Sequence, residues 1–332
     1  MNKEQIYERI QKQLSTVPLM LIGTGGSMPY GIPGMKALAD RLIESLSAKY
    51  SHLGDWHVFE DKLVGGMDLE NALVDIHFPD EVIVDIVEAT WQLVCDKDIE
   101  LMKSWDIRKN GLPLGKIIRR FYQADPRCVN IITTNYDRVI EYACDQMGLP
   151  VNTLFRGEYF KRYCDENIQR KNIVNVLKVH GSLDWYYKDG KQVVAIPLQE
   201  NIPLDFQPAI VTPGTSKYEN VLKSPFRDIL HEADTLIMQA TGYLCIGYGF
   251  NDNQIQTKLI EMCRLGKPIT IWTKWLSNAA INLIKSSSDN YIIVLAEDND
   301  QQKSKILFSD GTEIIDEKIW DQEGLLKVIM GG

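Results

Sequence analysis

The chain has 332 residues, which is enough for one large domain or two of ordinary size. With 45% hydrophobic and 24% charged residues, its composition is that of a globular protein rather than of a disordered or fibrous one. The formal net charge of −9 argues against a protein that coats nucleic acid, because binding a phosphate backbone requires a basic surface. A local pocket for one small anion remains compatible with this charge.

The sequence also predicts where the protein resides. No apolar run reaches the roughly 18 to 20 residues that span a bilayer, so we expect no contact with a membrane. Residues 1–14 are rich in charge and lack the apolar core of a signal peptide, which predicts a cytoplasmic location. Neighbouring cysteines lie 16 to 81 positions apart, so we expect buried free thiols and neither a zinc site nor a disulfide framework.

The first part of the chain alternates between helical and strand patterns. Residues 2–15 repeat apolar positions every four residues, which predicts a helix. The continuous apolar run at 17–22 predicts a strand buried on both faces, and the glycine-rich stretch 23–34 predicts a loop. An amphipathic helix is expected over 35–50. Residues 55–125 have helical periodicity and no convincing strand, so we interpret 53–125 as a helical insertion.

Strand patterns return in the rest of the chain and are separated by helical ones. Residues 185–225 contain Lys-Asp-Gly and several prolines, which predicts a hairpin and an irregular excursion. The predicted strands are 129–133, 173–179, 243–246, 268–273 and 291–296. This alternation predicts an α/β fold, a Rossmann-like and mostly parallel sheet with helices on both faces. We expect that domain to comprise residues 1–52 and 126–332.

Four of the predicted strands end in an unusual polar or glycine cluster. In parallel sheets, ligands bind beyond the carboxyl ends of the strands. The clusters follow residues 22, 133, 179 and 246, so a parallel sheet would place all four along one edge.

Each cluster alone allows two interpretations. The run from Gly23 to Ser27 could expose backbone N–H groups to a phosphate or could simply form a tight turn. Asn135 and Asp137 could hydrogen-bond a polar ligand or begin a helix. His180, which follows a strand and precedes a glycine, could exchange a proton near neutral pH or could be structural.

The last cluster contains two glycines beside a tyrosine. Gly247 and Gly249 could allow a ligand to approach the backbone or could form a turn. Asp252, which follows them, could contact the same ligand or could cap the next helix.

Taken together and in order, the four clusters resemble motifs of the sirtuin superfamily, and more closely its bacterial sirtuin-like branch in anti-phage defence. The resemblance rests on GTGGSMPYGIPG at 23–34, TTNYD at 133–137, KVHGSLDW at 178–185 and GYGFNDNQI at 247–255. It spans residues 18 to about 275 and implies binding of NAD+ as a substrate.

The resemblance also implies roles for individual residues. Asn135 and Asp137 would face the nicotinamide ribose and the carboxamide, and His180 would act on the ribose hydroxyls; these three are the predicted catalytic residues. The other predicted contacts with NAD+ are Gly23, Thr24, Gly25 and Ser27 at the phosphates, Gly247, Tyr248, Gly249 and Asp252 at the adenosine end, and Ile32, Pro33 and Thr134.

The sequence departs from the sirtuin deacetylases in two places. The two cysteine pairs that bind their structural zinc are missing, so we expect no zinc module. After Gly-Ile-Pro the deacetylase pattern continues Asp-Phe-Arg, whereas this chain has Gly34, Met35 and Lys36. Because related zinc-free members are NAD hydrolases, the resemblance implies cleavage of the nicotinamide N-glycosidic bond by water, with depletion of NAD+ during abortive infection.

Two alternatives remain open, namely a protein deacylase or ADP-ribosyltransferase, and a non-catalytic nucleotide-binding subunit of an assembly. The resemblance further implies a homo-oligomer and a separately encoded partner, such as a hexameric ATPase of the DNA-translocase type or an Argonaute-like protein. The candidate interface is the helical insertion, including Trp91 and Trp105, although each tryptophan taken alone is more typical of a protein core.

Overall fold

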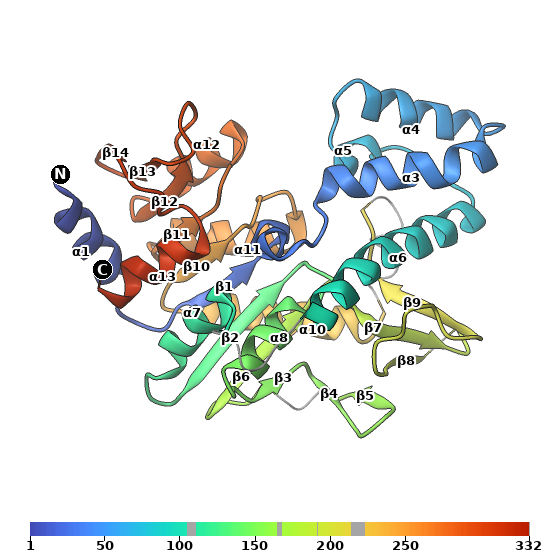
Figure 1. Ribbon diagram of the computed structural model, residues 1–332, viewed down its shortest axis with the longest axis horizontal. Coiled ribbons are helices and arrows are strands. Elements are labelled where there is room, and N and C mark those ends of the chain that lie inside the picture. Colours follow the sequence, from blue (N-terminus) through green and yellow to red (C-terminus); the bar gives the residue numbers. More distant parts are fainter. Residues whose placement is uncertain (105–110, 165–167, 191, 214–222, 332) are drawn as a thin grey trace.

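A nine-stranded sheet forms the centre of the protein in the computed structural model, which describes residues 1–104, 111–164, 168–190, 192–213 and 223–331 (Figure 1). Its strands lie in the order β14 (Gly311–Ile315), β13 (Ser304–Phe308), β12 (Tyr291–Ala296), β11 (Ile269–Trp272), β10 (Tyr243–Ile246), β1 (Leu19–Ile22), β2 (Cys128–Thr133), β6 (Ile173–Lys178) and β3 (Val151–Asn152). Strands β3 to β12 in this order are parallel, and the hairpin of β13 and β14 adds two antiparallel strands at one edge.

Helices cover both faces of this sheet. The described residues form the helices α1 (Lys3–Gln13), α2 (Thr24–Ser27), α3 (Met35–Tyr50), α4 (Gly54–Val64), α5 (Leu69–Ala72), α6 (Asp80–Ser104), α7 (Pro113–Tyr122), α8 (Val139–Gln146), α10 (Phe226–Gln239), α11 (Asn253–Arg264), α12 (Asn278–Ser287) and α13 (Gln322–Met330). A 3-10 helix, η1 (Met28–Tyr30), follows α2.

Strand β1 shows how the sheet separates two cores. Met20 and Ile22 belong to a core that α1, α7, α8 and α13 complete, whereas Leu19 and Leu21 point into a second core with α10, α11 and α12. Because both faces are covered, all four residues are buried, which explains the continuous apolar run in the sequence. The predicted α/β fold, with a mostly parallel sheet and helices on both faces, is confirmed.

The helices between β1 and β2 divide into two groups. Helices α3, α4, α5 and α6 contact one another and lie together at one end of the molecule, whereas α7 packs on α8, α13 and β2 of the main sheet (Figure 1). An aromatic cluster holds the first group together: the ring centroid of Trp56 lies 5.6 Å from that of Tyr50 and 5.3 Å from that of Phe59. Across the described residues, no helix is both long and apolar enough to cross a bilayer.

A second sheet, antiparallel and five-stranded, was not foreseen from the sequence. Its order is β4 (Phe155–Arg156), β5 (Lys161–Tyr163), β8 (Gln192–Ala195), β7 (Gly181–Lys188) and β9 (Phe206–Ile210). The expected hairpin is present between β7 and β8, where Asp189 and Gly190 have φ angles of 52° and 66°.

Two expectations about local structure need correction. The glycine-rich stretch predicted as a loop holds α2 and η1, because its small residues allow the chain to coil tightly after β1. Trp91 is no surface anchor: it is fully buried, and its Nε1 donates to Leu183 O at 2.9 Å, joining α6 to β7. Trp105 lies outside the described residues.

Candidate functional site

The four polar clusters meet at one edge of the main sheet, as the sequence predicts. Strands β10, β1, β2 and β6 are consecutive and parallel, so the segments that follow them lie side by side. They enclose a cavity of about 230 Å³. Twelve of the residues predicted to contact NAD+ line it, namely Gly23, Thr24, Ile32, Pro33, Thr134, Asn135, Asp137, His180, Gly247, Tyr248, Gly249 and Asp252.

Gly25 lies behind the cavity wall, where it contacts another glycine. Its N–H donates to Gly247 O at 3.0 Å. A Cβ on Gly247, which has a φ of +58°, would lie 2.2 Å from the carbonyl carbon of Gly25. The close approach of the β1 and β10 loops therefore explains both glycines without a ligand. Gly249 differs, since a Cβ there would meet only Asn251 Nδ2, at 3.7 Å.

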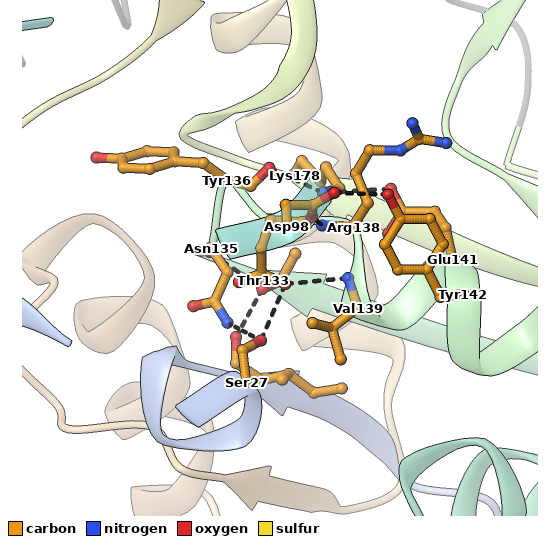
Figure 2. Close-up of polar contacts among 12 residues, drawn as sticks. Ser27, Asp98, Thr133, Asn135, Tyr136, Arg138, Val139, Glu141, Tyr142 and Lys178 are labelled. Atoms are coloured by element: carbon orange, nitrogen blue, oxygen red, sulfur yellow. Dashed lines mark hydrogen bonds and ion pairs between the residues drawn. The ribbon is translucent and has the colours of Figure 1, made fainter. Parts of the chain in front are cut away.

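Ser27 is fully buried and connects the two side chains expected to face the nicotinamide ribose (Figure 2). Its Oγ donates to Asp137 Oδ1 at 2.9 Å and accepts from Asn135 Nδ2 at 3.0 Å. Asn135 Nδ2 also donates to Gly23 O, at 3.0 Å. The structure thus places Ser27 beneath the cavity as a partner of Asn135 and Asp137, not on the cavity wall where the resemblance puts a phosphate contact.

These hydrogen bonds fix the orientation of the Asn135 amide. Because Nδ2 donates to Gly23 O and Ser27 Oγ, the other amide atom must be the carbonyl oxygen. This Oδ1 is buried and has no hydrogen-bond partner among the described residues. A buried carbonyl without a donor is costly, so the cavity offers an acceptor that suits a hydroxyl group or a water molecule.

Tyr248 offers a second polar atom in the same cavity. The residue is 4% exposed, and its hydroxyl also lacks a partner among the described residues. Burial, reinforced by the Asp252 carboxylate, raises the pKa of Tyr248 well above its ordinary value. The side chain therefore stays a neutral hydroxyl that can donate or accept a hydrogen bond.

His180 lies in the connection between β6 and β7 and faces Asp252 from the β10 segment. The distance from His180 Nε2 to Asp252 Oδ2 is 2.7 Å. Asp252 Oδ1 meanwhile accepts from Gln254 N at 2.9 Å and caps α11. The expected helix cap is therefore present, since one oxygen of Asp252 caps the start of α11, while the other oxygen contacts the His180 imidazole at the cavity.

Burial raises the pKa of Asp137 to about 6, although the nearby Lys178 ammonium lowers it. Asp137 Oδ1 accepts from Val139 N at 3.1 Å as well as from Ser27. Its proton is thus exchanged near the lower end of the physiological pH range, where a group can serve as an acid or a base.

The helical insertion contributes to the cavity in a way that the sequence analysis missed. Asp68 and Glu70, at the start of α5, line it, together with Val94 of α6. The negative charge of Glu70 contributes to the raised pKa values of Tyr136 and Tyr248, which places it near both rings. No motif marks these residues; only the fold of the insertion brings them to the sheet edge.

The described residues contain no group of three or more His, Cys, Asp or Glu side chains that could hold a metal ion. No cysteine among the described residues forms a disulfide, and burial raises the pKa of the Cys95 thiol to about 12. The Cys95 thiol is therefore protonated.

Comparisons with known proteins agree with the fold. A search of curated proteins found no match. A solved Sir2 homologue in complex with NAD matches with a TM-score of 0.50 and 14% identity, over 86% of this chain and 87% of that chain. A Sir2 homologue variant with ADP-ribose matches with a TM-score of 0.47 and 13% identity, over 88% and 90% of the two chains.

The first of these structures shows that the chain has a sirtuin-type Rossmann fold, whereas the identity is too low to transfer an activity. In sequence, residues 129–268 match the model of a family described as the SIR2-like domain. This segment runs from β2 through α11 and includes Asn135, His180 and Asp252, so the part of the chain that supplies most of the cavity is similar to SIR2-like domains.

Proposed function

We propose that the protein hydrolyses NAD+ to nicotinamide and ADP-ribose. The observation that carries the proposal is the meeting of Asn135 Oδ1, a buried acceptor without a partner among the described residues, and the His180 imidazole at one cavity. An acceptor and a proton-exchanging group are what a reaction between a sugar carbon and water requires.

The chemistry needs little from the protein at the leaving group. When the bond between ribose C1′ and the nicotinamide nitrogen breaks, the electron pair leaves with nicotinamide, which becomes neutral without protonation. The ribosyl cation that remains is stabilised by negative charge and is captured by water. Asn135 Oδ1 would hold the water or a ribose hydroxyl, and His180 would accept the proton that the water loses.

The charge of the cavity favours this reaction. Asp68, Glu70, Asp137 and Asp252 line it, so carboxyl groups surround the place where positive charge develops. A Cβ on Gly249 would have only Asn251 Nδ2 within 4 Å, at 3.7 Å, which leaves room for the dinucleotide to approach the backbone there. We assign Gly23 and Thr24, which line the cavity from the β1 segment, to the phosphates.

The proposed role is depletion of NAD+ in anti-phage defence, and it rests on the resemblance of the four motifs to that branch. We propose that activity depends on a homo-oligomer or a separately encoded partner. The insertion could provide the contact, because it exposes apolar side chains, among them Val58 at 49% and Val64 at 88%. Light-scattering mass tests the oligomer, and a strict monomer with and without NAD+ contradicts it.

Product analysis tests the function. The protein is incubated with NAD+ and acceptor peptides, alone and with its candidate partner, and nicotinamide, ADP-ribose and modified peptide are measured. We expect equal amounts of nicotinamide and ADP-ribose, and a loss of about a hundredfold or more in Asn135→Ala and His180→Ala. Peptide modification would indicate a transferase or deacylase, and binding without turnover would indicate a nucleotide-binding subunit. Near-normal turnover by folded His180→Ala contradicts the mechanism.

A further inference from the structure

A buried lysine lies beneath the loop that carries Asn135 and Asp137. Lys178 is the last residue of β6 and is 1% exposed. Its ammonium donates to Asp137 O and, at 3.4 Å, to Tyr136 O, and it lies 3.2 Å from Glu141 Oε1 (Figure 2). The three donors of the ammonium therefore meet three acceptors, which is how a charged lysine can be buried.

This arrangement fixes the loop from the side opposite to Ser27. Ser27 holds the side chains of Asn135 and Asp137 from the β1 segment, and Lys178 holds the main-chain carbonyls of the same loop from β6. Lys178 also brings a positive charge next to Asp137, and an opposite charge at such range favours the ionised form of a carboxyl group.

A carboxylate of the insertion acts on the same loop in the opposite sense. Asp98 belongs to α6 and is fully buried. Its Oδ2 accepts from Arg138 N at 2.7 Å, and its Oδ1 accepts from the Tyr142 hydroxyl at 2.5 Å. Burial raises the pKa of Asp98, but its two donors and the Arg138 and Lys178 charges oppose this and favour the ionised form, so a carboxylate lies against the backbone of the residue that follows Asp137.

We propose that Lys178 and Asp98 are opposing positioning residues for Asp137, Lys178 favouring its carboxylate and Asp98 favouring its neutral acid. The proposal rests on the proposed function for the role of Asp137 in the reaction. On this proposal, α6 of the insertion helps to set the charge of the site. Lys178 begins the motif at 178–185 but had no role assigned to it there, and Asp98 lies outside all four motifs.

The groups around Asp137 come from every element packed on it. Ser27 of the α2 segment donates a hydrogen bond, Lys178 of β6 and Asp98 of α6 carry opposite charges, and Arg138 and Glu141 belong to the α8 segment. Burial raises the pKa of Asp137, Lys178 lowers it and Asp98 raises it. Removing either charge should therefore move the titration in a known direction.

The experiment titrates Asp137 directly, by carbon NMR of protein labelled at the aspartate carboxyl, with Asp137→Asn identifying the signal. Lys178→Met should raise the pKa of Asp137 by about one unit or more. Asp98→Asn, which keeps the shape of the side chain and an oxygen for Arg138 N, should lower it. Ser182→Ala, a buried serine without a partner among the described residues, should leave it unchanged.

Opposite shifts support the proposal, and a purely structural role predicts no such pattern. Shifts in the same direction, or an Asp98→Asn midpoint at or above that of the wild type, overturn it. If Lys178→Met does not fold, the direction in Asp98→Asn decides alone.

NAD+ turnover as a function of pH separates this proposal from the proposed function. If Asp137 acts as a carboxylate, the acid limb of the pH profile of turnover should shift with the Asp137 pKa that NMR gives for Lys178→Met and for Asp98→Asn. Opposite NMR shifts in a protein that releases no nicotinamide under any condition would support the charge pair and contradict the hydrolase. Turnover of NAD+ without NMR shifts in the two variants would support the hydrolase and contradict the charge pair.

Discussion

Replacing Ser27 by alanine should weaken the protein and its site together. The substitution removes one hydrogen bond accepted from Asn135 Nδ2 and one donated to Asp137 Oδ1. A neutral hydrogen bond contributes about 1 kcal/mol and one to a charged group about 1.5–3 kcal/mol, so we expect a loss of about 3 kcal/mol in the free energy of unfolding. For a chain of 332 residues, that corresponds to about 4 °C in Tm.

The loss should also appear in the chemistry. Without Ser27, Asn135 keeps its bond to Gly23 O and Asp137 keeps its bond from Val139 N, so both side chains remain but are held less firmly. Small displacements of reacting groups cost up to about a hundredfold in rate, so NAD+ turnover should fall by about ten- to a hundredfold. The pKa of Asp137 should rise, because the Ser27 hydroxyl helps to lower it.

Ser182→Ala is the matched control. Ser182 is also fully buried and lies next but one to His180, yet its hydroxyl has no partner among the described residues. Removing it should change stability little or raise it slightly. Urea denaturation and NAD+ turnover are measured for both variants. If Ser27→Ala is as stable as Ser182→Ala, the hydrogen-bond reasoning is wrong, whatever the protein catalyses.

Three further predictions concern the glycines, Asp137 and the histidine. Gly247→Ala should fail to fold stably, because its Cβ would lie 2.1 Å from Gly26 N at a φ of +58°. Gly249→Ala should instead have a normal Tm and a raised KM for NAD+. Equal Tm values for the two variants would contradict this prediction. Because the folded pKa of Asp137 is raised to about 6, its stabilising contribution is complete only well below the unfolded pKa of about 4 and disappears as the pH rises through about 6. Wild type should therefore lose about 2 kcal/mol more than Asp137→Asn between pH 4 and pH 7; parallel urea curves would refute it. Asp252→Asn keeps the oxygen that caps α11, so Tm should be preserved. The variant loses the contact between the carboxylate and His180, so NAD+ turnover should fall by about tenfold or more. Unchanged turnover would show that this contact does not contribute to the reaction.

The centre of the main sheet could be predicted because its strands are short and mostly apolar, and four of them are followed by a polar or glycine cluster. Strands β1 and β10 are buried at all four positions, and no other structure accounts for such runs between helices. The five-stranded sheet could not be predicted, because its strands β4 and β5 have only two and three residues, too few for any periodicity. The C-terminal hairpin of β13 and β14 and the helices α12 and α13 were missed for want of motifs.

The sequence predicted which residues lie at the sheet edge but not the hydrogen bonds between them or the residues that the insertion adds. Position beyond a parallel strand indicated Asn135 and His180, since that rule requires only the order of strands. The partnership of Ser27 with Asp137 joins positions 110 residues apart, and a single sequence shows no sign of it. The entry of Glu70 into the cavity depends in turn on how the insertion folds.

The contact between the β1 and β10 loops constrains how such a protein can evolve. Gly25 and Gly247 touch through main-chain atoms on both sides, the N–H of one and the carbonyl of the other. An enlarged residue at either position has no side chain opposite that a second mutation could shrink. A second mutation therefore cannot compensate for a substitution at this contact. We expect sequence variation around the cavity to be confined to positions where side chains, rather than main chains, touch.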